Sequence, residues 1–421
     1  MKRRDFVKQI GIAGGLAALP WQGALGADPT VSSPARPSGH DDRQDPPARS
    51  ADDNDPGAAG EAWQALVEVL RTCDRSFIDG QRGRFDDAEM AYGYRNLAHI
   101  VTFATQLYLY GDPDAPVFIP VQDAPIEKTL GGNPDVLYSF APVRGDRRYR
   151  ITGRRGDEAY LAFTLHRGTR GSGFQQFFQS HLNQHALKSD ANGNFEVIVS
   201  PKREGENWLQ SSPDATEVYA RVYLFDPDRD RPARFRIESL DTPLPRRLGR
   251  NDVAERLRQM TQIIQDLTRA MPQPLKDPNR VGDLWQVERD GPSQMWQALD
   301  NVYCRGVFAL EPAQALVLEG QVGSCDYWGI QLWNPFLGSG DYRLGPVSIN
   351  TSRAHLGRDG SFRVAIARED PRVPGLDWIH TAGEHQGTFF IRWMCPKTKP
   401  TAPTCRLVTL PELRAAAPPR S

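Results

Sequence analysis

The sequence has 421 residues, and its 51 Lys and Arg against 52 Asp and Glu give a formal net charge of −1 at pH 7. A balance this even provides no bulk electrostatic attraction to nucleic acid or to an anionic membrane surface, so we expect neither as a partner. At roughly 100–200 residues per domain, the length allows two or three domains.

The first 27 residues have the pattern of a twin-arginine export signal. Arg3, Arg4 and Phe6 fit R-R-x-F-[L/V]-K, and a short apolar stretch from Ile10 to Trp21 precedes small residues at 25–27. That stretch is shorter than the roughly 20 residues of a membrane span. We predict recognition by the twin-arginine translocase, a periplasmic or secreted location, and no stable membrane insertion after cleavage. The alternative is a chance Arg-Arg pair before a core segment.

Two segments with different compositions follow. Residues 28–57 are rich in Asp, Pro, Ser, Ala and Arg and nearly lack large apolar side chains, which predicts a disordered linker. Residues 58–114 carry apolar residues at helical spacing in two runs, with Asp86 or Asp87 capping the second and Gly111 ending it. The apolar residues are Trp63, Leu66, Val67 and Leu70, and then Met90, Leu97, Val101, Ala104 and Tyr108.

From residue 115 the pattern changes to short alternating segments divided by Gly, Asn and Asp. Such segments are typical of antiparallel strands with one buried face. A long amphipathic helix interrupts them, from its candidate cap Asn251 to Met271, and Pro272 ends it. We predict a first β domain at 115–245, a helical connection at 246–300 and a second β domain at 301–421.

An internal repeat relates the two β domains. Three pairs of glycine or phenylalanine residues recur 167 positions apart, and a pair of tryptophans recurs 170 apart. An offset that grows only at a loop predicts a duplication. The predicted fold is mainly β with helices (α+β): two related antiparallel β-sandwich-like domains, an N-terminal helical segment and one long inter-repeat helix. The pairs are Gly153 and Gly320, Gly193 and Gly360, Phe195 and Phe362, and Trp208 and Trp378.

The five cysteines allow disulfide bonds in an oxidising compartment. Cys395 could pair with Cys405, and Cys304 with Cys325, or all five could remain thiols; the odd number leaves one free thiol in any pairing. The cysteine spacings fit no haem or iron–sulfur site, so no cofactor is expected.

We also expect no metal site. His181 and His185 stand four apart, as metal ligands do on a helix. Their surroundings favour strand and turn, where that spacing separates the two residues by about 13 Å.

Several segments resemble a bacterial family catalogued as domain of unknown function 1214. The resemblance covers roughly residues 115–393 and implies a β-rich fold, often paired with a related domain of type 1254. It implies no activity, because none is established for that family. The segments are Asn133 to Tyr138 with Tyr149 to Gly153, Tyr342-Arg343 with Pro346 to Asn350, and Asp377 to Thr388 ending at Arg392-Trp393.

Four titratable residues are candidate catalytic groups: Asp135, His380, Glu384 and His385. Asp135 belongs to the Asn-Pro-Asp segment before a strand. The other three share one loop, where His and Glu within hydrogen-bond reach could exchange a proton near neutral pH. The alternatives are an Asx turn at Asp135 and a purely structural polar turn before the last strand.

Six further residues are candidate ligand contacts. Aromatic and amide side chains from 327 to 334 could stack on sugar rings or other flat polar ligands; alternatively, the aromatics form the core of a β-sandwich. Motifs of nucleotide enzymes, common serine hydrolases and zinc proteases are missing from the sequence. The candidates are Tyr138, Tyr327, Gln331, Trp333, Trp378 and Arg392.

Two functions of different classes follow. The preferred hypothesis is an exported soluble enzyme that acts on a glycan or similar polar envelope substrate in a cleft between the β domains. It requires titratable groups of the two repeats to converge on one pocket. The alternative is an exported, non-catalytic protein that binds a small molecule or carbohydrate, which requires part of the 327–333 segment to be accessible.

Overall fold

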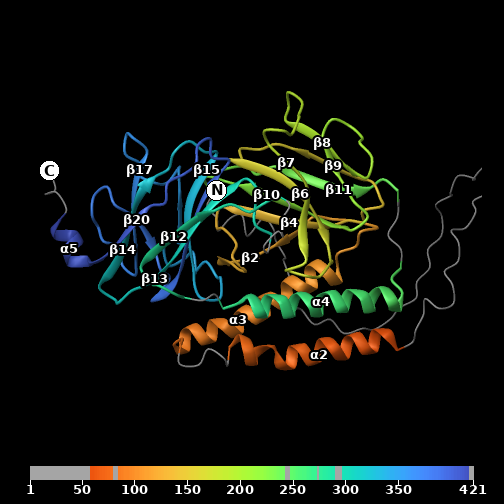
Figure 1. Ribbon diagram of the computed structural model, residues 1–421, viewed down its shortest axis with the longest axis horizontal. Coiled ribbons are helices and arrows are strands. Elements are labelled where there is room, and N and C mark those ends of the chain that lie inside the picture. Colours follow the sequence, from red (N-terminus) through yellow and green to blue (C-terminus); the bar gives the residue numbers. More distant parts are fainter. Residues whose placement is uncertain (1–56, 79–83, 242–246, 273–274, 290–295, 417–421) are drawn as a thin grey trace, which may run out of the picture.

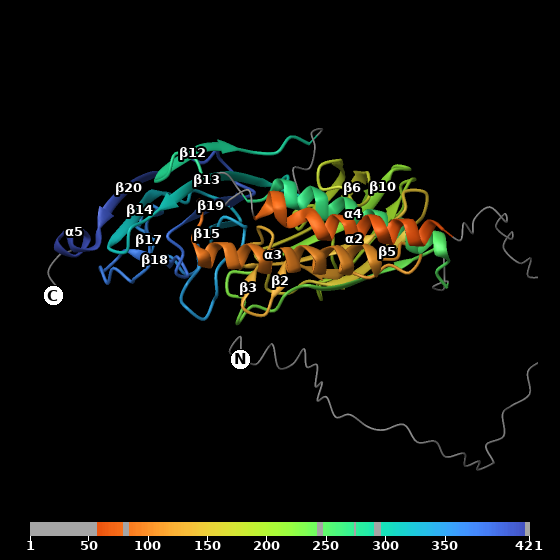
Figure 2. The ribbon, with the colours of Figure 1, turned by 90° about the horizontal axis from the view of Figure 1, so that it is seen from below.

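The computed structural model describes residues 57–78, 84–241, 247–272, 275–289 and 296–416. The predicted signal at 1–27 and nearly all of the predicted linker lie outside the described residues. Two β-rich halves stand side by side, and three long helices run along one side of them (Figures 1 and 2). No described helix has the length and apolar character that crossing a membrane requires.

The helices begin close to their predicted caps. Asp86 caps the second helix: its carboxylate accepts the Glu89 N–H at 2.8 Å, and the Glu89 carboxylate accepts the Asp86 N–H at 2.9 Å. The long inter-repeat helix is capped at Gly249 instead of Asn251, with the Asp252 carboxylate accepting the Gly249 N–H at 2.7 Å. The helices are α2 (Ala58–Phe77), α3 (Asp87–Ala104) continued by a π-helical turn (Thr105–Leu109), α4 (Arg250–Ala270) and α5 (Leu410–Ala415).

The buried face of α2 differs from the predicted one. Trp63 is 52% exposed and Leu70 39%, whereas Ala58 and Ala62 lie in the core together with Leu66. α2 packs against α4, and its buried side carries Ala58, Ala62 and Leu66, which leaves Trp63 and Leu70 on the outside.

The two repeats have the same topology, which confirms the mainly β fold and the duplication. The five-stranded sheets run β1-β4-β10-β6-β7 and β12-β13-β19-β15-β16; the four-stranded sheets run β11-β5-β8-β9 and β20-β14-β17-β18. Each repeat has its own core between its two sheets. The sheets are antiparallel, as predicted, and each four-stranded sheet adds one parallel pair at its edge, β8–β9 and β17–β18.

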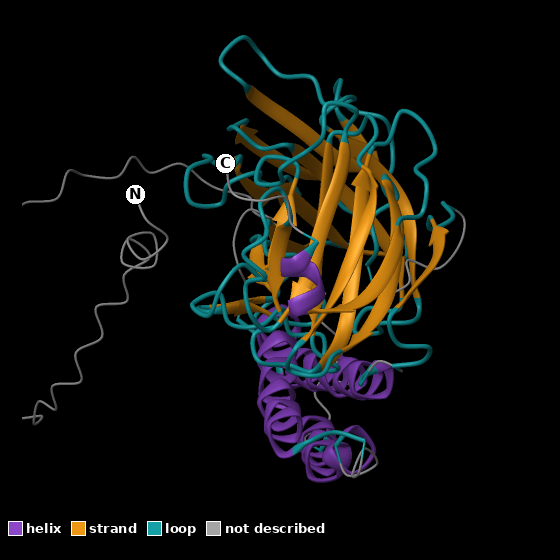
Figure 3. Ribbon diagram, turned by 90° about the vertical axis from the view of Figure 1, so that its left-hand side faces the viewer, coloured by secondary structure: helices purple, strands orange, loops and turns teal. Residues whose placement is uncertain are grey.

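The strands fill both β domains and reach into the predicted helical connection, where β12 forms the edge of the second five-stranded sheet. Figure 3 shows the strands stacked above the helices. The first-repeat strands are β1 (Ile119–Val121), β4 (Val136–Pro142), β5 (Tyr149–Arg154), β6 (Tyr160–Gly168), β7 (Gln176–Asn183), β8 (Asn194–Ser200), β9 (Trp208–Gln210) and β10 (Ala215–Tyr223), with β11 (Arg234–Ser239); β2 (Asp123–Ala124) and β3 (Glu127–Lys128) form a small hairpin. The second-repeat strands are β12 (Arg280–Trp285), β13 (Asn301–Ala309), β14 (Gln314–Gln321), β15 (Tyr327–Trp333), β16 (Ser348–Asn350), β17 (Ser361–Ala367), β18 (Asp377–His380), β19 (Gln386–Met394) and β20 (Thr404–Thr409).

Two of the three landmark pairs, Gly153 with Gly320 and Phe195 with Phe362, have one physical cause. Gly153 pairs with Phe195 across β5 and β8, and Gly320 pairs with Phe362 across β14 and β17. A Cβ added to Gly153 would lie 2.5 Å from Cζ of Phe195, and one added to Gly320 would lie 2.8 Å from Cζ of Phe362. The missing side chain makes room for a ring that covers the glycine, so each pair is retained together.

The tryptophan landmarks also have equivalent roles. The Trp208 indole N–H donates to the Ser200 carbonyl at 3.2 Å, and the Trp378 indole N–H donates to the Ala367 carbonyl at 3.0 Å. Both carbonyls lie at the end of the neighbouring strand. In each repeat, the indole therefore adds a side-chain hydrogen bond that holds the two parallel strands together at their ends.

Candidate functional site

A cavity of about 210 Å³ lies between the outer faces of the two five-stranded sheets. The first repeat contributes β4 and β10, and the second contributes β13, β15 and β19. Phe103 of α3 and Leu267 of α4 close it from the helical side, and Trp296 closes it from the connection before β13. Three arginines and no acidic residue line this cavity, which we call the inter-repeat cavity.

Two of these arginines occupy equivalent positions in the repeats. Arg221 lies on β10 and Arg392 on β19, the central strand of each five-stranded sheet. Arg221 pairs with Tyr138 on β4, and Arg392 pairs with Tyr303 on β13. The duplication therefore places the same arginine–tyrosine pair on both walls of one cavity.

Both arginines are buried, at 2% and 6% exposure, and both stack on aromatic rings. The Arg221 guanidinium lies 3.8 Å from the Tyr219 ring centroid and donates to the Thr164 hydroxyl at 3.2 Å and to the Trp296 carbonyl. The Arg392 guanidinium lies 4.7 Å from the Phe390 centroid and 5.3 Å from that of Trp333.

Within the described part of the chain, neither Arg221 nor Arg392 has a carboxylate at ion-pair distance. The buried Nη1 of Arg392 also has no hydrogen-bond partner among the described residues. A buried charge without a counter-charge is unfavourable in a low-dielectric interior. The arrangement is therefore complementary to an anion.

Two further observations show that the arginines face a shared polar space. Burial raises the pKa of the Tyr138 hydroxyl, and the charges of Arg392 and Arg221 both oppose that rise. On β15, the fully buried Gln331 has an amide nitrogen and an amide oxygen that both lack a partner among the described residues. Gln331 pairs with Phe390, two residues before Arg392 on the neighbouring strand β19. Buried polar atoms are nearly always hydrogen-bonded, so the unpartnered amide and guanidinium on these two strands indicate a position for a polar ligand or water.

Arg221 is connected to a buried hydrogen-bond network of the first repeat. The Thr164 hydroxyl that accepts from Arg221 is 2.9 Å from His181 Nδ1, and His181 Nε2 is 2.7 Å from an Asp300 carboxylate oxygen. Tyr160 and Asn183 donate to the same carboxylate at 2.7 and 2.8 Å. Burial alone would raise the pKa of Asp300, but the hydrogen bond and charge of His181, with those donors, hold that pKa well below its usual range.

Three of the six predicted ligand residues line the cavity, namely Tyr138, Trp333 and Arg392. Every residue of β15 is buried, so access to this strand is limited to the cavity wall that Trp333 forms. Tyr327 lies in the junction between the repeats, and Trp378 closes its strand pair instead of facing the cavity. Arg221 was not among the predicted ligand residues, although it lies on the strand of the first repeat that is equivalent to the strand of Arg392.

Asp135 is buried in a clamp between the repeats. Its carboxylate accepts from the Tyr327 hydroxyl at 2.8 Å and from Asn350 Nδ2 at 2.9 Å, and it forms a 2.6 Å ion pair with Arg353. The Asp135 N–H donates to Asn133 Oδ1 at 3.0 Å, so the Asn-Pro-Asp segment is an Asx turn. The carboxylate is thus occupied by three partners from the second repeat.

The remaining catalytic candidates lie at the other end of the same strands. Tyr327 pairs with Met394 and Trp333 with Thr388, so the Asp135 clamp and the loop before β19 are separated by the length of β15. Six strand steps span about 20 Å. The expected convergence of Asp135 with His380, Glu384 and His385 is not found, and none of the four lines the inter-repeat cavity.

Glu384 and His385 lie instead beside the start of α3. His385 Nδ1 is 3.5 Å from an Asp86 carboxylate oxygen. Burial, and then the charge of Glu89, raise the pKa of Glu384 to about 7. His380 is the last residue of β18, and its Nδ1 accepts the Ala382 N–H at 3.1 Å within the turn that follows this strand.

All five cysteines are free thiols, so neither sequence-based pairing forms. Cys405 lies on β20 and Cys395 follows β19, in different sheets of the second repeat. His181 lies in β7 and His185 in the turn after it, as predicted.

One family model and two solved structures are similar to this chain, and the first of the structures supports the fold. Residues 139–227 match a family described as a protein of unknown function, DUF1214. The crystal structure of an uncharacterized protein from Burkholderia cenocepacia has a TM-score of 0.76 and 25% identity, and the match covers 85% of this chain and 99% of that one. A protein from Vibrio parahaemolyticus has a TM-score of 0.45 and 11% identity, covering 76% and 98%. No curated protein matches.

The DUF1214 match confirms part of the predicted resemblance. It covers most of the first repeat, including the strand that carries Arg221 and the predicted segment Tyr149 to Gly153, whereas the predicted segments at 133–138 and 342–393 lie outside it. The pairing with the 1254 type remains a prediction.

Proposed function

We propose that this protein binds a small organic anion in the inter-repeat cavity. The observation that carries the proposal is the pair of buried, equivalent arginines, Arg221 and Arg392, that face one space without a carboxylate partner among the described residues. Arginine presents a planar fork of donors that matches a carboxylate.

The shape and lining of the cavity favour a ring-shaped carboxylate. A cavity of about 150 Å³ holds benzene in another protein, so about 210 Å³ accommodates one substituted six-membered ring. Phe390 and Trp333 of the second repeat offer flat apolar surface, and Tyr138, Gln122 and Gln297 offer polar contacts in the same cavity. An aromatic acid or an acidic sugar has the required combination of ring and charge.

The binding hypothesis fits this geometry better than a glycan-processing enzyme does. The lining contains arginines, tyrosines and amides, but neither an acid nor a histidine that could transfer a proton to a substrate. The predicted catalytic residues are divided among the Asp135 clamp, the end of β18, where His380 lies, and the start of α3.

Titration calorimetry with benzoate, glucuronate and glucose tests the proposal. We expect at least one of the two acids to bind, glucose to bind far more weakly, and Arg392→Gln or Arg221→Gln to weaken binding about 10- to 100-fold, because a hydrogen bond to a charged group contributes about 1.5–3 kcal/mol. Arg236→Gln, at an exposed arginine of β11, is the control and should leave affinity unchanged. Equal binding of glucose and glucuronate, or an unchanged affinity of Arg392→Gln in a protein with native circular dichroism, would contradict the proposal.

We further propose that the ligand is met outside the cytoplasm, after export by the twin-arginine translocase. The support is the sequence of residues 1–27 alone. Replacing Arg3 and Arg4 by lysine should abolish export and leave the protein in the cytoplasmic fraction, because the paired guanidinium groups define the signal. Unchanged export of that variant would show that the motif is not used.

A further inference from the structure

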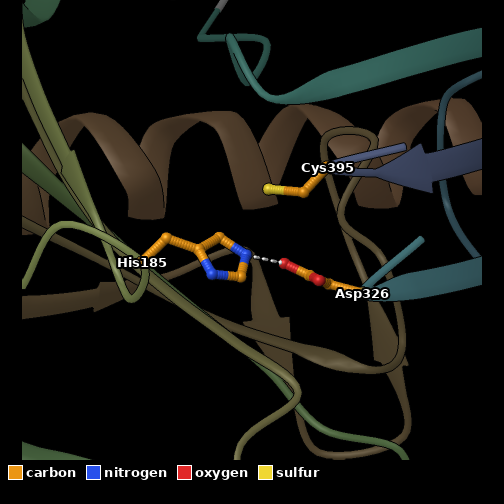
Figure 4. Close-up of side chains that lie close together, drawn as sticks. All are labelled: His185, Asp326 and Cys395. Atoms are coloured by element: carbon orange, nitrogen blue, oxygen red, sulfur yellow. Dashed lines mark hydrogen bonds and ion pairs between the residues drawn. The ribbon is translucent and has the colours of Figure 1, made fainter. Parts of the chain in front are cut away.

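Three metal-ligating side chains from distant parts of the chain meet at the boundary between the repeats. His185 follows β7, Asp326 directly precedes β15 and Cys395 directly follows β19. An imidazole nitrogen, a carboxylate oxygen and the thiol sulfur all lie within 4.8 Å of one another. His185 Nε2 is 2.5 Å from an Asp326 carboxylate oxygen. Figure 4 shows this contact with the Cys395 thiol beside it.

Sheet register positions two of these groups. Tyr327 pairs with Met394, and the Asp326 N–H donates to the Met394 carbonyl at 2.9 Å, so Asp326 and Cys395 lie at adjacent strand ends. Cys395 has a φ of 47°, a left-handed conformation that is uncommon for a residue with a side chain. Its N–H donates to the Asp300 carbonyl at 2.8 Å, which fixes the thiol at this turn.

The third group comes from the first repeat and is held by the same network. The Asn183 side chain accepts the His185 N–H at 3.1 Å and donates to the Asp300 carboxylate at 2.8 Å. Gln184 donates to the Asp326 carboxylate at 2.7 Å and so orients it from outside the cluster. Outer hydrogen bonds of this kind fix ligand orientation in known metal sites.

We propose that His185, Asp326 and Cys395 bind a borderline-soft divalent cation of the Zn²⁺ class. One nitrogen, one oxygen and one sulfur donor form the mixed set that Zn²⁺ accepts, and three protein ligands leave a fourth tetrahedral position for water. Bond lengths of about 2.0–2.3 Å place tetrahedral donors about 3.4–3.7 Å apart. The imidazole must therefore move by about 1 Å away from the carboxylate, and the 60% exposed His185 side chain is free to do so.

The charge around the thiol is consistent with a cation. The Asp326 carboxylate lies within 4.8 Å of the Cys395 sulfur and supplies negative charge there. When the ion binds, the Cys395 thiol releases its proton to solvent, and the thiolate forms the metal–sulfur bond. Binding therefore releases about one proton per metal near neutral pH and links the two repeats.

Two other groups of acidic and histidine side chains in the described chain contain no thiol. Asp86, Glu89 and His385 also meet, but Asp86 and Glu89 form the capping box of α3. His355 and Asp377 form a 2.6 Å pair without a thiol. The His355–Asp377 pair is a matched control, because it also joins an imidazole to a carboxylate and its histidine is also exposed.

The experiment uses the full chain, reduced, treated with chelator and then titrated with Zn²⁺ and Co²⁺. We expect one Zn²⁺ per chain, release of about one proton, a higher Tm with Zn²⁺, and the near-ultraviolet charge-transfer absorption of a thiolate–Co²⁺ bond. Cys395→Ser and His185→Ala should weaken Zn²⁺ binding at least about 100-fold, since losing an outer partner alone weakens metal binding 10- to 100-fold. His355→Ala and Cys405→Ser should leave it unchanged.

Three results would overturn the proposal. One is Zn²⁺ affinity that is equal in the native protein and in Cys395→Ser. Another is a Co²⁺ complex without thiolate absorption. The third is a mass measurement before reduction that finds Cys395 in a disulfide with the neighbouring Cys325, which would remove the ligand.

Discussion

Replacing Asp135 with alanine should lower the free energy of unfolding by about 3–5 kcal/mol. The Asp135 carboxylate is 1% exposed and accepts from Tyr327, Asn350 and Arg353, all in the second repeat. Its removal leaves the buried Tyr327 hydroxyl and Asn350 amide with fewer partners, at about 1–3 kcal/mol for each unsatisfied group. Arg353, which is 39% exposed, loses its ion pair but keeps access to water. Urea unfolding followed by circular dichroism measures the loss.

The same experiment separates a structural role of Asp135 from a catalytic one. Asp146→Ala is the matched control, because the Asp146 side chain is 63% exposed and only 3.4 Å from the exposed Arg144; we expect a change within about 0.5 kcal/mol. Asp135→Asn keeps the shape and one acceptor and should fall between the two. A loss below about 1 kcal/mol for Asp135→Ala would show that the clamp does not hold the repeats together.

Stability should fall as pH rises from about 5 to 8, and Glu217 should cause much of this fall. Glu217 is 1% exposed on β10 and accepts from the Trp296 indole N–H at 2.9 Å. Burial raises its pKa to about 7, against the smaller opposing effects of Trp296 and of the Arg170 charge. A carboxyl whose pKa is higher in the folded than in the unfolded state stabilises the fold most at pH values below its unfolded pKa. This stabilisation is lost as the pH rises through the folded pKa.

Glu217→Gln tests this pH dependence directly. One pKa unit corresponds to about 1.4 kcal/mol. The shift from 4.5 to about 7 therefore predicts that the free energy of unfolding of the variant exceeds that of the native protein by about 3 kcal/mol at pH 8, with little difference at pH 4.5. Part of the pH dependence should persist, because Glu384 also has a pKa raised to about 7. Glu196→Gln, at a side chain that is 54% exposed, is the control. A variant as pH-dependent as the native protein would contradict the assignment.

The candidate site was only partly predictable because its groups converge across the two repeats. Arg392, Trp333 and Tyr138 were identified as ligand candidates, since they stand in aromatic or recognisable segments. Arg221 was not, because an arginine in an alternating strand segment indicates an exposed position unless the partner surface is known. The catalytic candidates were grouped because their residue types suit acid–base chemistry. In the structure, the length of β15 separates Asp135 from the loop before β19 by about 20 Å.

The sequence by itself determined the features that depend on local periodicity and recurrence. Alternation marked the strands, the helical spacing marked α3 and α4, and the constant offset of glycine and phenylalanine landmarks revealed the duplication, because a ring over a glycine needs both residues together. Each of these signals is carried by residues close in sequence or by two copies of one pattern.

Only the tertiary structure decided which polar side chains are paired. Asp135 and Glu384 are both acids in loops, yet one is enclosed by an arginine, an amide and a hydroxyl, and the other has a raised pKa beside Glu89. His185, Asp326 and Cys395 are separated by up to 210 positions and meet only because sheet register and the packing of the repeats join their ends. Burial and electrostatic pairing are set by contacts across the whole chain, and no local pattern in the sequence encodes them.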